Sequence, residues 1–333
     1  MSEPLHPSNL SEILDRTAQL YRSRFLVFAG IAIIPTAAIL IPACAVILLF
    51  IWMESLGANS ATPAVAGGLA AVLIAAIALV AAPAWLAVAA LTSAAMSHAA
   101  SRACMDEKTT IRDAYESIRR RGLHYFGLYV VQTFLIWGVP FAVWFLLVGL
   151  AAVAVSVVHR AGAAAGALVG FVAFVVVAAL FVYGVLMLLR LSLAFPACVV
   201  ERVDILAALK RSNHLSKGSR GRICLLYLLG AALTWIVSMG ITIPLTIIIA
   251  LLPGTNSPER AQTAAMVMAV AVYGAAFAVQ ALIKPVYGIA LMLFYYDQRI
   301  RLEGFDIELM MQRAGLEPEH AAASETPQAI DSR

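Results

Sequence analysis

Residues 223–252 read ICLLYLLGAALTWIVSMGITIPLTIIIALL, a continuous segment without a charged side chain. A helix rises about 1.5 Å per residue, so roughly 20 apolar residues cross the hydrocarbon core of a bilayer. This segment is longer than that minimum. It therefore predicts a transmembrane helix.

Five further apolar segments are long enough to do the same, and they cover roughly residues 25–53, 65–97, 125–157, 163–195 and 262–296. Apolar residues make up 62% of the 333 positions and charged residues 13%, with a mean hydropathy of +0.90. Soluble domains are only about half apolar and about a quarter charged. The sequence therefore predicts an all-α fold, a polytopic bundle of six transmembrane helices. Each segment contains or adjoins a proline, which predicts kinks at Pro35, Pro42, Pro83, Pro140, Pro196, Pro244 and Pro285.

Basic residues gather on one side of the predicted bundle. The short loops that follow the first, third and fifth segments contain only Arg160 and Arg260. By the positive-inside rule, both termini are expected in the cytoplasm. Because the basic residues adjoin membrane boundaries rather than forming a patch with aromatic residues on a soluble surface, nucleic acid is excluded as a partner.

An internal repeat is visible around the second and fourth segments. Residues 99–114 read AASRACMDEKTTIRDA, and a shift of 94 positions gives LAFPACVVERVDILAA at 193–208. The leading isoleucines of three short amphipathic stripes, Ile13, Ile111 and Ile205, are 98 and 94 residues apart. The sequence thus predicts one membrane domain, residues 1–316, with three parallel two-helix units at about 9–108, 109–203 and 204–299. An amphipathic helix at 305–315 and a disordered tail at 317–333 are expected to follow.

Two cations inside the apolar segments are candidate ligand-binding residues. Arg190 and Lys284 are also 94 positions apart, and no Asp or Glu lies in the interior of any predicted segment. Snorkelling to the headgroups is one interpretation. The other is a shared pocket for an anion or lipid headgroup, with hydrogen bonds from Gln132 and Gln280.

The amphipathic stripes and their flanks predict a basic interfacial collar that either caps the bundle or binds anionic lipid or a partner protein. Its residues are Arg16, Arg22, Arg24, Arg119, Arg120, Arg121, Lys210, Arg211, Arg220, Arg222, Arg299 and Arg301. A row of small residues, Gly162, Gly166 and Gly170, predicts close helix packing within the chain or between subunits.

Known catalytic motifs are missing from the sequence. It contains no HExxH, GxSxG or P-loop, and its six histidines and four cysteines are scattered without metal-ligand spacing. We therefore expect no catalytic residue, no metal and no cofactor.

Three stretches resemble a set of six-helix bacterial membrane proteins related to the membrane domain of some glycerophosphodiester phosphodiesterases. They are LSEILDRTAQLYRSRF at 10–25, PACVVERVDILAALKRS at 196–212 and YYDQRIRLEGFDIEL at 295–309. Where this family often has Trp, Asn213 stands here, and no phosphodiesterase barrel follows. The resemblance implies a location in the bacterial inner membrane and six helices, and it does not carry the hydrolase activity.

From these features we expect a non-enzymatic scaffold or lipid-binding protein that acts in envelope or lipid homeostasis. Its expected partners are membrane lipids, anionic phospholipid in particular, and a membrane protein or a second copy of the chain. The alternative is a transporter or channel for a small anionic or lipid-like substrate.

Overall fold

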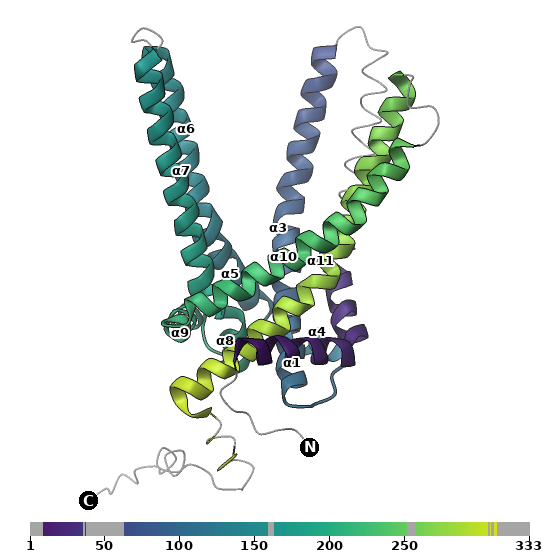
Figure 1. Ribbon diagram of the computed structural model, residues 1–333, viewed down its shortest axis with the longest axis vertical. Helices are drawn as coiled ribbons and strands as arrows, with labels where there is room; N and C mark the ends of the chain where they lie inside the picture. The colour runs from purple at the N-terminus through teal and green to yellow at the C-terminus, as the bar shows by residue number, and fades with distance from the viewer. Residues whose placement is uncertain are drawn as a thin grey trace, which may run out of the picture.

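The structure, a computed structural model, describes residues 9–35, 37, 63–158, 163–251, 258–305, 307, 310 and 311 (Figure 1). Every regular element within these ranges is helical, which confirms the predicted all-α class. In chain order the elements are α1 (Leu10–Ser23), α3 (Pro63–Cys104), α4 (Ile111–Arg119), α5 (Gly122–Thr133), the π-helix η1 (Phe134–Gly138), α6 (Val139–Val158), α7 (Ala163–Leu191), α8 (Ala194–Glu201), α9 (Ile205–Ser216), α10 (Arg220–Ala250) and α11 (Pro258–Glu303). A short apolar helix, Phe25–Pro35, follows α1.

Four stretches of the described chain are long and apolar enough to cross a membrane: Gly122–Leu150, Gly170–Glu201, Arg220–Ile248 and Gly274–Glu303. They confirm the membrane character of the protein and correspond to the third to sixth predicted segments. The second prediction coincides with α3, a single helix of 42 residues. Most of the first prediction lies outside the described residues, as do most of the predicted helix 305–315 and the tail 317–333.

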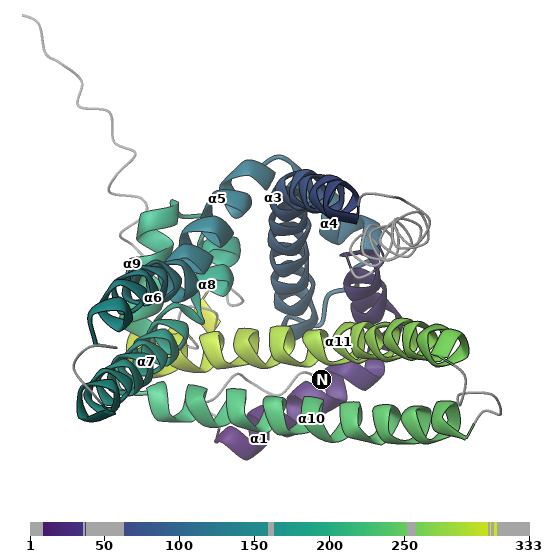
Figure 2. The same cartoon turned by 90° about the horizontal axis from the view of Figure 1, so that it is seen from above.

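The short helices α1, α4, α8 and α9 gather with the ends of α3 and α11 in one layer, which we call the base (Figures 1 and 2). Apolar side chains from separate helices are fully buried there, including Ile13, Ile118, Leu193 and Tyr295. In α1 and α4 the buried residues are four positions apart, on one side of each helix, whereas α8 buries six consecutive residues, 194–199. The stripe residues Ile13, Ala114 and Ala208 are all at most 1% exposed.

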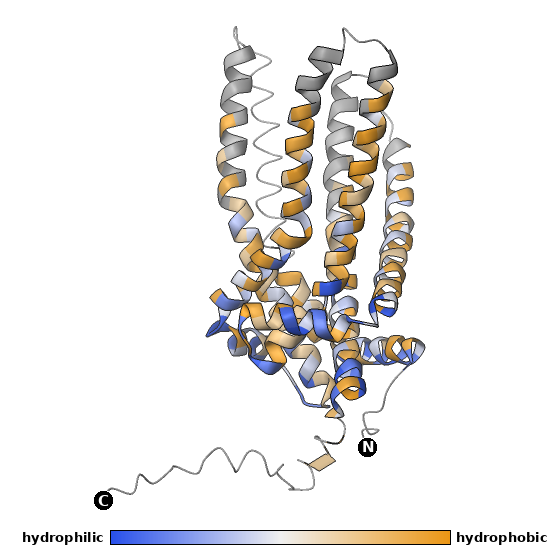
Figure 3. Ribbon diagram, turned by 90° about the vertical axis from the view of Figure 1, so that its left-hand side faces the viewer, coloured by the Kyte–Doolittle hydropathy of each residue, from blue (hydrophilic) through white to orange (hydrophobic). Residues whose placement is uncertain are grey.

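Beyond the base, hydrophobic residues predominate along the long helices (Figure 3), and many of their large apolar side chains are exposed. In the apolar part of Gly122–Leu150 only 6% of the residues are buried inside the protein, compared with 50% in Gly274–Glu303. The α6/α7 pair and the α10/α11 pair diverge as they leave the base (Figure 1). A water-soluble monomer would not expose this much contiguous apolar surface, so lipid is its natural solvent.

Five of the prolines at which kinks are predicted lie in three different structural settings. Pro83, Pro244 and Pro285 lie inside continuous helices. Pro140 comes directly after the π-helix η1, where a wider turn accommodates a residue that cannot donate a backbone hydrogen bond. Pro196 stands in the first turn of α8, after the chain leaves α7 through a turn at residues 192–193.

Candidate functional site

A cavity of about 270 Å³ lies where α3, α5, η1, α10 and α11 meet the α7–α8 turn. Lys284 of α11 and Gln132 of α5, two of the candidate ligand-binding residues, both line it. The other polar residues of its lining are all neutral: Ser93, Ser97, Tyr129, Thr133, Ser192, Tyr227 and Tyr287. Lys284 is thus the one charged residue of the described lining.

Local packing explains how Lys284 reaches this space. Three residues after Lys284 on α11, the ring of Tyr287 stands 5.9 Å from that of Tyr227 on α10, centroid to centroid. A Cβ on Gly230 would come within 2.3 Å of the Tyr287 ring, so only glycine leaves room for it. Met96 of α3 similarly occupies the space beside Gly288. Small residues therefore let α3, α10 and α11 approach closely around the cavity.

Lys284 and Gln132 both have polar atoms in the cavity without a hydrogen-bond partner among the described residues. The side chain of Lys284 has no hydrogen bond or ion pair with any described residue. Gln132 donates from Nε2 to the carbonyl oxygen of Leu191 at 3.1 Å, but its buried Oε1 has no partner there. By contrast, the hydroxyls of Ser93, Ser97 and Ser192 are all donated to carbonyls of their own helices. The cavity therefore offers a cation and an unfilled hydrogen-bond acceptor.

Of the two cations predicted to share a pocket, only Lys284 lines this cavity. Arg190 does not line the cavity, although its Nε is buried without a partner among the described residues. Its carbonyl oxygen accepts from Ser212 Oγ of α9 at 2.8 Å, beside the α7–α8 turn. Gln280 is exposed and also lies outside the lining. Arg190 is the penultimate residue of α7, whereas Lys284 lies within the long helix α11, which runs on to Glu303.

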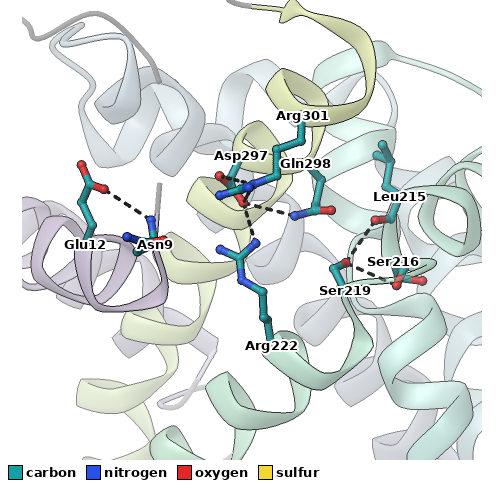
Figure 4. Close-up of polar contacts among 9 residues, drawn as sticks. All are labelled: Asn9, Glu12, Leu215, Ser216, Ser219, Arg222, Asp297, Gln298 and Arg301. Carbon is teal, nitrogen blue, oxygen red and sulfur yellow. Dashed lines mark hydrogen bonds and ion pairs between the residues drawn. The ribbon is translucent and has the colours of Figure 1, made fainter. Parts of the chain in front are cut away.

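The predicted collar proves to be mainly an internal network. Asp297 of α11, 2% exposed, pairs with Arg222 of α10 at 3.2 Å and with Arg301 at 3.0 Å (Figure 4). Further collar residues that contact other parts of the chain are Arg16, Arg24, Arg121, Arg211, Arg220 and Arg299. Lipid attraction therefore cannot be the common role of the collar.

A second cluster joins α8, α9 and α11. Arg211 Nε lies 2.9 Å from Glu201 Oε1, its Nη2 lies 2.6 Å from Glu303 Oε2, and Tyr295 donates to Glu201 at 2.6 Å. Burial lowers the pKa of Arg211, but the two carboxylates outweigh it and raise that pKa above its ordinary value. Arg211 is therefore held in the charged form as part of the base.

Four collar residues remain exposed without an ion pair in the described part of the chain: Arg22, Arg119, Arg120 and Lys210. They are the ones free to meet anionic headgroups. Five of the other collar residues pair with carboxylates: Arg24, Arg211, Arg222, Arg299 and Arg301. For Arg301, the spacing of four residues from Asp297 was a signal available in the sequence.

The predicted glycine row finds no packing partner where it is described. At Gly170 a Cβ would meet nothing within 4 Å. Gly162 lies outside the described residues, and Gly166 lies in α7 with its surroundings undescribed. Packing between subunits stays a prediction for this row.

Residues 22–298 match a protein family described as "Domain of unknown function (DUF7847)". No curated protein and no solved structure matches the chain significantly. The matched region covers most of the chain and includes every residue that lines the Lys284 cavity. The chain therefore belongs to the DUF7847 family.

Proposed function

We propose that this protein is a non-enzymatic membrane protein that binds an anionic, hydroxyl-bearing group in the Lys284 cavity. The group belongs to a membrane lipid or to a soluble phosphate ester, which share this chemistry. One observation carries the proposal: Lys284 lies inside an apolar helix and faces a cavity whose described lining contains no carboxylate. The wider role that follows is in lipid or envelope homeostasis.

The cost of the charge supports this proposal. A lysine within the membrane costs about 2.5–3.5 kcal/mol on insertion scales unless it is paired or reaches the headgroups. Buried charges in proteins are ordinarily paired, and here the described surroundings supply no counter-charge. An anion bound at the ammonium group would offset that cost.

The unfilled acceptor on Gln132 narrows the ligand further. An anion alone satisfies Lys284, but Gln132 Oε1 needs a donor. A phosphate ester of a polyol supplies both, since its phosphate faces the ammonium group and a hydroxyl can donate to the amide oxygen. Phosphatidylglycerol and glycerol phosphate are therefore suitable probes of the two sources.

The test compares wild type with Lys284→Gln, which keeps a polar side chain and removes the charge. Native mass spectrometry of gently extracted protein, titrated with phosphatidylglycerol, reports bound lipid directly, and glycerol phosphate is titrated in parallel. The variant should bind the anionic probes about tenfold or more weakly, because a hydrogen bond to a charged group contributes roughly 1.5–3 kcal/mol. Lipid binding without glycerol phosphate binding would identify a lipid headgroup as the source.

Lys217→Gln is the matched control, because Lys217 is exposed at the end of α9 and lies outside both the cavity and the predicted collar. It should bind both probes as wild type does. Equal binding of phosphatidylglycerol by wild type and Lys284→Gln would overturn the proposed function.

We also propose the complete topology: six membrane helices in three parallel units, in the bacterial inner membrane, with both termini in the cytoplasm. The order of a short helix followed by two long ones supports it, since α4 precedes α5–α7 and α9 precedes α10 and α11. The length of α3 and the apolar start at Phe25–Pro35 are consistent with a first pair. We also propose kinship with the membrane domains of glycerophosphodiester phosphodiesterases. The three sequence stretches at 10–25, 196–212 and 295–309 support it.

Transport of a small anionic or lipid-like substrate is the second candidate function. The observation that favours it is the position of the polar cavity between helix pairs that diverge from the base. Uptake of radiolabelled glycerol phosphate into proteoliposomes would distinguish transport from binding. A binding protein retains the ligand without moving it across the bilayer.

A further inference from the structure

We propose that the ligand of the Lys284 cavity is a lipid whose acyl chain lies in an apolar groove between α6 and α7. This inference rests on the proposed function and identifies its ligand class. The groove has a volume of about 330 Å³. Its walls are apolar side chains of η1, α6 and α7, among them Trp144 and Phe181.

The groove and the cavity adjoin each other. Ile136 and Trp137, both in the π-helix η1, line the two spaces together. Gln132, whose amide faces the cavity, lies in the turn of α5 just before η1. The wider turn of a π-helix thus stands between a polar compartment and an apolar one, a position where such turns often serve function.

The pairing of the two compartments matches the two ends of a lipid. Lys284 and the acceptor on Gln132 suit a polyol phosphate headgroup, while the groove presents no charged residue in its lining. A soluble phosphate ester would use only the polar compartment. Because the two compartments meet at Ile136 and Trp137, their arrangement favours a single ligand with its headgroup in the cavity and its acyl chain in the groove.

The groove contributes selectivity more than affinity. Acyl chains in a bilayer are already surrounded by apolar groups, so moving one into an apolar groove removes little surface from water. Binding strength must come from the headgroup at Lys284, and the groove selects for a chain that fits beside Trp144 and Phe181. Filling the groove should hence affect lipid without affecting a soluble headgroup.

The test places a large side chain in the groove with Val177→Trp. Val177 lines the groove, and its neighbour Val175 on α7 is similarly exposed but does not. Val177→Trp should lower phosphatidylglycerol retention about tenfold or more and leave glycerol phosphate binding unchanged. Val175→Trp, the matched control, should change neither.

A second measurement uses the unmodified protein and does not depend on how a variant folds. Phosphatidylglycerol with a photoreactive diazirine on its acyl chain is cross-linked to wild type, and the labelled peptides are mapped. We expect labelling concentrated in residues 136–144 and 177–188. Lys284→Gln should abolish that concentration.

The outcomes separate the two proposals. Unchanged lipid retention in Val177→Trp, or labels spread evenly over α6, α7 and α10, would overturn the acyl-chain site. If Lys284→Gln still weakened anion binding, the proposed function would stand without the groove. If Lys284→Gln had no effect on either probe, both proposals would fail.

Discussion

At the scale of single residues, two kinds of position organise this protein: glycines where helices meet and one buried carboxylate. Gly230 leaves room for the Tyr287 ring that lines the cavity. The side chain of Asp297, which is 2% exposed, pairs with both Arg222 and Arg301. Both act through close contacts between α10 and α11, so their substitutions should have local and measurable effects.

Gly230→Ala should weaken anion binding with little change in stability. The new methyl group would stand 2.3 Å from the Tyr287 ring, and the ring must swing toward the cavity. Alanine also gains up to about 1 kcal/mol of helix propensity, which offsets part of the crowding. Phosphatidylglycerol titration and thermal unfolding in detergent measure the two quantities.

Gly240→Ala serves as the control on the same helix, because nothing lies within 4 Å of its Cβ position. It should unfold at the same or a slightly higher temperature and bind normally. Unchanged binding in Gly230→Ala would show that Tyr287 does not shape the site.

Asp297→Asn should destabilise the protein by roughly 2 kcal/mol or more, because it leaves two arginines without their shared carboxylate in a largely buried place. Asp106→Asn removes a comparable pair with Arg24, but the side chain of Asp106 is 83% exposed. Exposed pairs contribute about 0–1 kcal/mol, so this control should cost little. Thermal unfolding measures the loss of stability in both variants. Equal losses would contradict the role of Asp297 as the shared partner of the two arginines.

At the scale of elements, the short helices of the base are defined by their caps and stripes. Thr110 and Asp113 form a capping box at the start of α4, with hydrogen bonds of 3.1 and 3.2 Å. Asn9 donates its backbone N–H to Glu12 at 3.3 Å at the start of α1 (Figure 4). These local patterns are readable from the sequence because both partners are three residues apart.

The cap of α4 should be sensitive to acid. Hydrogen bonds from Thr110 hold the pKa of Asp113 below its ordinary value. Because the folded pKa of Asp113 lies below the unfolded value of about 3.9, its ionised carboxylate stabilises the cap fully above that value. This stabilisation is lost as pH falls through the folded pKa. Amide exchange in α4 should therefore accelerate on acidification below about pH 4 relative to the intrinsic rate.

Thr110→Ala removes the same cap and should cost about 1 kcal/mol of local stability at neutral pH. Exchange in this variant should be faster at pH 7 and depend less on acid than in wild type. An acid response as large as that of wild type would contradict the role of the Thr110–Asp113 box.

Elements that depend on distant partners were harder to predict. The apolar segments located α3, α7, α10 and α11 to within several residues, because apolar length alone defines a membrane helix. The break at residues 192–193 was missed, and so was the separation of Arg190 from Lys284. In the candidate site, Lys284 and Gln132 could be selected by their polarity alone. Their neighbours Tyr227, Tyr287 and Met96 come from three helices, and no local pattern brings these together.

At the scale of the whole molecule, the base holds the densest core and the long helices spread from it into lipid. Several basic residues of the predicted collar form ion pairs that join the elements of this layer. Arg211, for example, pairs with both Glu201 and Glu303.

The proposed topology makes a global prediction. Alkaline phosphatase fused after residue 316 should be inactive, and the same enzyme inserted in the loops near Arg160 or Arg260 should be active, because it folds only in the periplasm. Green fluorescent protein should give the reverse pattern. Periplasmic activity of the fusion after residue 316 would exclude an even number of spans with a cytoplasmic start.

The most direct test of the account is a cryo-electron microscopy map of the protein in nanodiscs that contain phosphatidylglycerol. We predict headgroup density within hydrogen-bonding distance of Lys284 Nζ and Gln132 Oε1, continued by a chain between α6 and α7. A map in which a carboxylate of the protein occupies the Lys284 ammonium and no lipid enters the cavity would contradict the central claim.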